Sequence, residues 1–435
     1  MRKIMLAATA IAGFAALSTN AQAGDMMLGS DSFAAGLASG AALAPGDITV
    51  RLRAAMWIEG GYQVDSGNKT SAGKNSGEFL GSYVRLYPKF DAKTPGGLEY
   101  GATLELRMNS GTGAGSSGSD TMYARRYNAY VGTPTIGRFF IGPENNALAR
   151  QVAGSTMEDF DYNGGFNGDF SAQQPAYAQY TWTTPRSGGF YTTNKIVYIS
   201  PAFSGFTFGA AFEPNASVGE PALASGGNQN ASSSTLNSNV SQRRNTYDFG
   251  VRYAGSLGPV AVTAGAGYLG AGRVLSNQAA SAQTGSNTPY KNLSIVSVGG
   301  RLTYGPAAVG GLFTTGAINT GAGMIRQGQK DASMIITGAQ YIIGQAIFGF
   351  QYVTQTAGGT FNSLTPRSTL REYGIAVGGA YDFAPGATVY GDVFYDARHE
   401  FGTNLIAGTA NAAGSLTAGN KVQSRGVQIG TSFHW

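Results

Sequence analysis

A group of acidic residues lies within an unusually long polar stretch, residues 143–191, and these are the residues best suited to chemistry. The segment EDFDYNGGFNGD supplies four carboxylates, those of Glu158, Asp159, Asp161 and Asp169. Asp159, Asp161 and Asn163 match the first half of an EF-hand calcium loop, but Phe170 stands where that loop needs a bidentate Glu. The pattern favours an acidic turn-forming loop without a cofactor, and calcium bound in another geometry is the alternative.

The remaining residues give little support to an enzyme. His399 and His434 lie far apart without metal-ligand spacing, and no Ser–His–Asp set can be proposed. The Gly-rich segment 111–118 does not follow a strand and open a helix, so it is predicted to be a surface loop rather than a phosphate cradle. We therefore predict that the chain is not an enzyme.

Apolar and polar residues alternate strictly in segment after segment, which is typical of β-strands with two different environments. In 48–58 one face is apolar and the other carries Arg51 and Arg53. In 82–109 the polar faces carry Arg85, Lys89 and Arg107. The elements that position the charged residues are therefore strands.

The connections between these strands alternate in length as regularly as the side chains alternate in polarity. Short turns are expected at 94–97, 204–205, 256–259, 305–306, 343–345 and 384–386, and long polar stretches separate them. Short turns on one rim and long loops on the other are typical of an outer-membrane barrel and not of a sandwich. Counting strands predicts a closed all-β barrel of sixteen antiparallel strands over residues 47–435, which leaves no unpaired edge in lipid.

The N-terminal residues 1–23 have the pattern of a secretory signal peptide. Arg2 and Lys3 precede the apolar stretch 4–17, and Ala21-Gln22-Ala23 resembles a cleavage site. Residues 24–46 form a leader without an assigned role. Charged residues are only 12%, the basic ones are scattered, and the net charge is +5, so nucleic acid is not expected as a partner.

Three segments resemble the general trimeric porins of Gram-negative bacteria. They are SYVRLYPKFDAKTPGGLEYGATLELR at 82–107, RRYNAYVGTPTIGRFFIGPENNA at 125–147, and the C-terminal VQIGTSFHW. The resemblance implies a homotrimer in the outer membrane, in contact with its lipid and lipopolysaccharide. It also implies passive diffusion of small hydrophilic solutes through a pore narrowed by an inward-folded third loop, here 143–191. Phe433 and Trp435 would be the signal that the barrel-assembly machinery recognises.

If the long stretch folds inward, its acids face basic residues of the wall across a narrow gap. The expected wall residues are Arg51, Arg53, Arg85, Lys89 and Arg107. Opposed charges across a constriction create a transverse field that disfavours large apolar solutes. Arg125 and Arg126 are weaker candidates, because the apolar pattern turns Arg126 inward whereas alignment to the porin pattern turns Arg125, Ala129 and Val131 inward. An external lid with solvated charges is the alternative.

Two further interpretations stay open. A channel selective for sugars or anions would need aromatic or concentrated basic residues along the lumen, and the polar faces show neither clearly. Aromatic residues near strand ends are expected to form girdles at the membrane interfaces; these are Trp57, Tyr62, Tyr130, Tyr268 and Trp435.

Overall fold

The computed structural model describes the protein over residues 45–65, 77–111, 122–152, 166, 193–214, 244–272, 291–318, 325–359, 369–401, 403–404, 409–410 and 420–435. The predicted signal peptide and nearly all of the predicted leader lie outside these residues. So do the loop acids Glu158, Asp159, Asp161 and Asp169, and with them Asn163.

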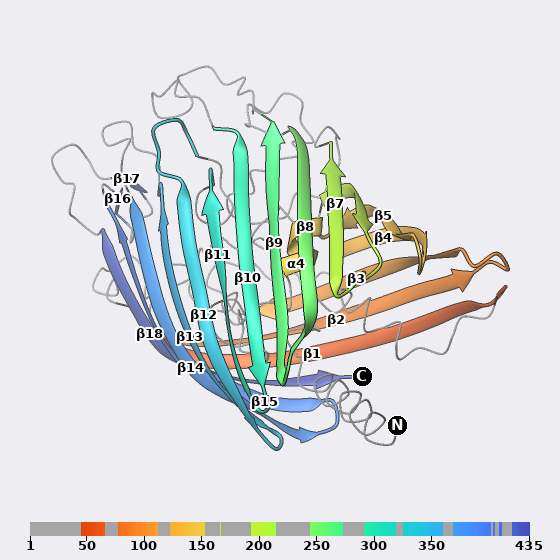
Figure 1. Ribbon diagram of the computed structural model, residues 1–435. Coiled ribbons are helices and arrows are strands. Elements are labelled where there is room, and N and C mark those ends of the chain that lie inside the picture. The colour runs from red at the N-terminus through yellow and green to blue at the C-terminus, as the bar shows by residue number, and fades with distance from the viewer. Residues whose placement is uncertain are drawn as a thin grey trace.

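The described chain forms one closed antiparallel barrel, as the alternation and turn spacing predicted (Figure 1). Its strands are β1 (Ile48–Asp65), β2 (Gly77–Lys93), β3 (Glu99–Gly111), β4 (Tyr123–Thr133), β5 (Gly137–Glu144), β6 (Thr193–Ile199), β7 (Phe206–Glu213), β8 (Arg244–Leu257), β9 (Val260–Gly272), β10 (Leu293–Tyr304), β11 (Ala307–Gly316), β12 (Ala332–Ile343), β13 (Ala346–Ala357), β14 (Leu370–Ala384), β15 (Ala387–Glu400) and β18 (Lys421–His434). The short strands β16 (Thr403–Asn404) and β17 (Thr409–Ala410) form a separate pair.

Each barrel strand pairs with the next barrel strand along the chain, β15 with β18 included, and β18 closes the barrel against β1. β18 pairs with β1 from Ser424 opposite Asp65 to His434 opposite Ala55. Trp435 continues this ladder, since its backbone N–H donates to the Ala54 carbonyl (3.1 Å) and its carbonyl accepts from the Ala54 N–H (2.8 Å). The C-terminal residue is therefore part of the seam.

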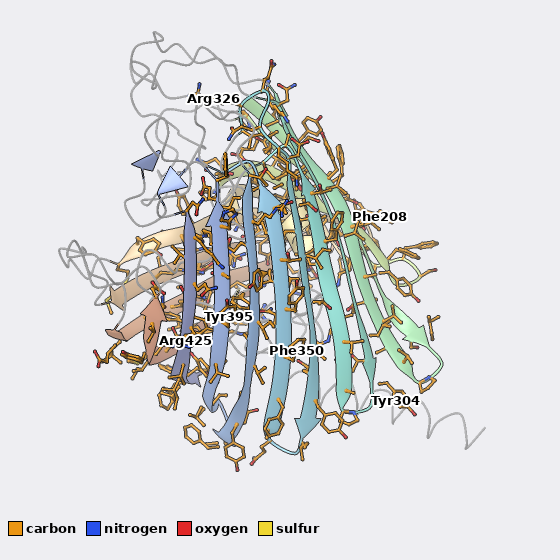
Figure 2. All side chains as sticks on the ribbon, turned by 90° about the vertical axis from the view of Figure 1, so that its left-hand side faces the viewer. Phe208, Tyr304, Arg326, Phe350, Tyr395 and Arg425 are labelled. Carbon is orange, nitrogen blue, oxygen red and sulfur yellow. The ribbon has the colours of Figure 1, made fainter. Side chains whose placement is uncertain are left out.

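The barrel reverses the usual distribution of side chains in a soluble protein. On β1 the outward Val50 and Leu52 are 63% and 66% exposed, whereas the inward polar Glu59 is fully buried. The same alternation places Phe208 and Phe350 on the outer face (Figure 2). An apolar outer face and a polar inner face are what a barrel in lipid requires.

The short turns fall where the sequence predicts them. Gly305 between β10 and β11 and Gly344 between β12 and β13 have φ values of +54° and +58°. Glycine adopts this left-handed conformation without the steric cost of a Cβ atom. These turns lie on the same rim as the C-terminus, because an even number of strands brings the chain back to the side on which it began.

One short helix, α4 (Ala147–Val152), lies inside the barrel behind β8 and β9 in the view of Figure 1. All six of its residues are buried, and it packs on β7, β8 and β9. Gly267 makes room for it, because a Cβ atom there would lie 2.6 Å from Leu148 Cδ1. In the part of the chain that the structure describes, no helix is long and apolar enough to cross a bilayer.

Candidate functional site

The basic residues predicted for the wall share the inner face of β1, β2 and β3. Strand alternation turns Arg51, Arg53, Arg85, Lys89 and Arg107 inward, on the same face as the buried carboxylates. Arg51 lies directly opposite Lys89, and Arg85 directly opposite Arg107. The pair Arg51 and Lys89 and the pair Arg85 and Arg107 therefore lie at two different heights along the inner wall.

A β-bulge on β4 explains the conflicting pattern around Arg125 and Arg126. Arg126 pairs with Glu105 and Ala124 with Leu106, so Arg125 is an extra residue between two partners. A bulge allows two consecutive side chains to point to the same face. Both arginines are buried inside the barrel, while Ala129 and Val131 are exposed on the outer face, opposite to the orientation given by alignment to the porin pattern.

Glu105 is the centre of an arginine cluster on the inner wall. Its carboxylate lies 2.5 Å from Arg107 Nη2, 2.7 Å from Arg125 Nη1 and 3.2 Å from Arg126 Nη2. Glu105 is fully buried, so its charge is compensated by pairing instead of by water. One carboxylate facing three guanidinium groups leaves this part of the wall positive.

Asp91 forms a second centre closer to the short-turn rim. It accepts hydrogen bonds from Arg51 and from the Tyr130 hydroxyl, and it pairs with Lys89 at 3.1 Å. The Arg51 and Lys89 side chains are 31% and 21% exposed, but Asp91 is only 2% exposed. A solute in the lumen therefore meets the two cations before the carboxylate.

Aromatic residues of the inner wall pack around Arg85. Trp57 and Tyr83 stack with ring centroids 4.7 Å apart, and the Arg85 guanidinium lies 4.9 Å from the Trp57 ring centroid. Tyr83 and Tyr390 both donate hydrogen bonds to Glu59, at 3.0 and 2.5 Å. The prediction that Trp57 and Tyr130 belong to an interface girdle is wrong, since both point inward and are buried. Tyr62 and Trp435 are exposed on the outer face.

Polar contacts fix the six-residue helix α4 to the inner wall. The Leu148 N–H donates to Asp248 Oδ1 on β8 (2.7 Å), and Asn146 Oδ1 caps the helix by accepting from the Ala149 N–H (2.5 Å). Arg150 pairs with Glu144 at 2.9 Å, and Glu144 also pairs with Arg126 at 3.1 Å. The start of the long third connection is thus fixed inside the barrel.

A second point of the same connection reaches a different part of the wall. Phe166 is buried, and its N–H donates to Gln351 Oε1 on β13 (2.7 Å). Its ring lies over Gly374 on β14, where a Cβ atom would stand 2.4 Å from Phe166 Cζ. The described points of the connection between β5 and β6 therefore lie inside the barrel, one anchored on β7–β9 and the other on β13–β14.

Sequence reasoning missed several charged residues of the lumen. Inward cations also come from Arg138, Arg150, Lys195, Arg252 and Arg301, and inward acids from Glu372, Asp392, Asp396 and Glu400. The acids give β14 and β15 an acidic inner face, which Arg398 partly compensates through its 2.7 Å pair with Glu372. Alternation in 387–400 could have revealed them, because Asp392 and Asp396 alternate with Val393 and Tyr395.

Metal chemistry finds no support among the described residues, which contain no group of three His, Asp or Glu side chains that could hold an ion. The calcium candidates Asp159, Asp161 and Asn163 lie outside the described residues, as do the other acids predicted for the loop side of the constriction. The described residues form a polar inner wall with clustered cations on β1–β4 and carboxylates on β14 and β15, together with two anchored points of the third connection.

Comparison with known proteins agrees with this geometry. A family model described as Gram-negative porin matches residues 7–399. The anion-selective porin from Comamonas acidovorans shares 15% identity, with a TM-score of 0.55 over 89% of this chain and 100% of that chain. A loop-deletion form of OmpT from Vibrio cholerae shares 16% identity, with a TM-score of 0.54 over 89% and 99% of the two chains. A search of curated protein sequences gives no match. The chain belongs to the Gram-negative porin family and forms an outer-membrane channel for passive diffusion of small hydrophilic solutes and ions.

Proposed function

We propose that this porin prefers anions to cations. The observation that carries the proposal is the layering of charge on the inner wall: Arg51 and Lys89 are partly exposed over the buried Asp91, and Arg107 is 12% exposed over a fully buried Glu105. Arg53 is exposed on the same face and has no carboxylate partner among the described residues. Charges that line a pore raise the local concentration of the opposite ion.

A likeness in fold also supports anion preference. The Comamonas porin is described as anion-selective, and it shares the barrel at 15% identity. The acidic inner face of β14 and β15 works against anion preference, but its carboxylates Asp392, Asp396 and Glu400 are buried. We therefore expect a moderate preference instead of exclusion of cations.

The reversal potential in a planar bilayer under a tenfold KCl gradient tests the proposal. The wild type should give the sign of anion preference, and replacing Arg51, Arg53 and Lys89 together by glutamine should move the potential toward the cation side. Lys330→Gln removes an exposed cation that lies outside the strands and serves as the matched control. A cation-selective wild type, or a triple variant that matches the wild type, would refute the proposal.

We further propose a charged constriction in the pore and a homotrimeric assembly. We propose that the acids Glu158, Asp159, Asp161 and Asp169 form the loop side of a constriction whose wall side includes Arg51, Arg53, Arg85, Lys89, Arg107, Arg125 and Arg126. The inward anchors at α4 and Phe166 support this arrangement. A homotrimer is supported by the family assignment, because porin relatives are trimers.

We also propose that the barrel-assembly machinery recognises Phe433 and Trp435. The outer face of the barrel is proposed to contact lipopolysaccharide. The place of Trp435 at the seam between β18 and β1 supports a role in barrel closure. The apolar outer face supports lipid contact.

A further inference from the structure

The outer face of the barrel carries a basic patch at one sector of the long-loop rim. Four basic side chains point outward there: Arg371, His399, Lys421 and Arg425. Arg371 pairs with His399 and His399 with Lys421, so three of them form one row across β14, β15 and β18. Among the described residues, none of the four has a carboxylate within ion-pair distance. They alternate along their strands with the inward Glu372, Glu400 and Ser424.

Arg425 marks the boundary between this patch and the apolar belt. It lies between Tyr395 on β15 and Val64 on β1, and Figure 2 shows it beside Tyr395 on the outer face. From Val427 to Trp435 the outward positions of β18 carry no charge. At about 3.3 Å per residue and a tilt of about 40°, those eight steps span roughly 20 Å, close to the apolar band of a membrane barrel. Arg425 therefore stands at headgroup depth.

An apolar groove begins directly below Arg425 on β14, β15 and β18 and extends onto β13. Its volume is about 630 Å³, and its outward lining includes Val377, Gly379, Gly391, Val393, Val427 and Ile429. Gly379 and Gly391 lie opposite each other and present no side chain, which makes the wall hollow there. Val427 is the next outward residue after Arg425, and Val393 the next after Tyr395. The patch and the groove are thus continuous.

We propose that this continuous surface is a binding site for lipopolysaccharide, with lipid A phosphates on Lys421, Arg425 and their neighbours and one acyl chain in the groove. Guanidinium and ammonium groups bind phosphate through charge-assisted hydrogen bonds. The patch lies on the long-loop rim, which in a porin faces the outer leaflet. The proposal rests on the lipopolysaccharide contact proposed above and on the porin assignment for this orientation, and it is independent of the anion preference of the lumen.

The test uses the full mature chain refolded in detergent without lipopolysaccharide. Native mass spectrometry and titration measure binding of bisphosphorylated lipid A and of its dephosphorylated form. Replacing Lys421 and Arg425 together by glutamine should weaken binding of the phosphorylated lipid at least tenfold, the order expected for two basic residues near an anionic surface. Val393→Trp should weaken binding of both lipids by filling the groove, while Lys330→Gln should bind as the wild type does.

Equal affinity of the wild type and the double variant for phosphorylated lipid A would overturn the proposal. So would equal affinity of the wild type for the two lipid forms. If the double variant loses subunit association while lipid binding stays unchanged, the surface is an interface with a second copy, which also overturns it. Conductance measured in bilayers without lipid A separates these outcomes from a failure of the channel function, because lumen residues are intact in every variant.

Discussion

Replacing Gly374 by alanine is expected to release Phe166 from the inner wall. The new Cβ atom would stand 2.4 Å from Phe166 Cζ, closer than any ordinary contact, so the ring must move. Movement gives up the burial of a phenylalanine side chain, about 2 kcal/mol. It also gives up the Phe166 N–H to Gln351 Oε1 hydrogen bond, about 1 kcal/mol net. A loss of about 3 kcal/mol corresponds to roughly a hundredfold shift toward the released state.

A single introduced thiol can report this release, because the chain has no cysteine. Ala376 lies on the inner face of β14, is fully buried and belongs to the same packed cluster as Phe166. In the Ala376→Cys protein, a hydrophilic thiol reagent should react slowly. Adding Gly374→Ala should raise the reaction rate by about ten- to a hundredfold, the range set by partial or full loss of the contacts.

Phe166→Ala is the matched comparison, because it removes the ring without touching the strand. It should raise the thiol reaction rate to a similar extent, and combining it with Gly374→Ala should add little, since both changes remove the same contact. Unchanged reactivity in a folded Gly374→Ala protein would refute the assignment of Phe166 to this position. So would full additivity of the two substitutions.

Two other substitutions test the arginine cluster and the seam. Glu105→Gln leaves Arg107, Arg125 and Arg126 without their shared carboxylate. Breaking a buried ion pair should lower the free energy of unfolding by about 3 kcal/mol, which a urea titration of the refolded barrel measures. A stability equal to that of the wild type would contradict the role given to Glu105. Deleting Trp435 removes two backbone hydrogen bonds to Ala54 and should reduce the fraction of folded barrel, measured by heat-modifiable gel mobility; an unchanged folded fraction would argue against a role in closure.

The barrel itself follows from local rules that the sequence displays. A strand turns successive side chains to opposite faces, so Val50 and Leu52 against Arg51 and Arg53 predict two environments before any pairing is known. Short turns such as 305–306 then predict which strands are neighbours. Those two signals are enough for the closed topology, because lipid does not tolerate an open edge.

The inner wall is less predictable, because its contacts depend on register between strands. The bulge at Arg125 adds one residue on β4 between the partners of Glu105 and Leu106, and the conflicting pattern around Arg125 and Arg126 does not by itself identify it as a bulge. The chemical type of Trp57 and its place near a strand end predict a membrane interface, although the alternation of its own strand puts it on the inward face with Arg51 and Arg53. In the lumen its ring stacks on Tyr83, and the Arg85 guanidinium lies over it.

Side-chain length also explains why counting charges in the sequence does not give the sign of selectivity. Aspartate and glutamate are short and stay near the strand backbone, whereas arginine and lysine reach further into the lumen. In the pairs Arg51–Asp91 and Arg398–Glu372 the cation is accordingly more exposed than its carboxylate, 31% against 2% and 14% against 0%. A wall of matched pairs can therefore present a positive surface to a passing solute, even where the formal charges cancel.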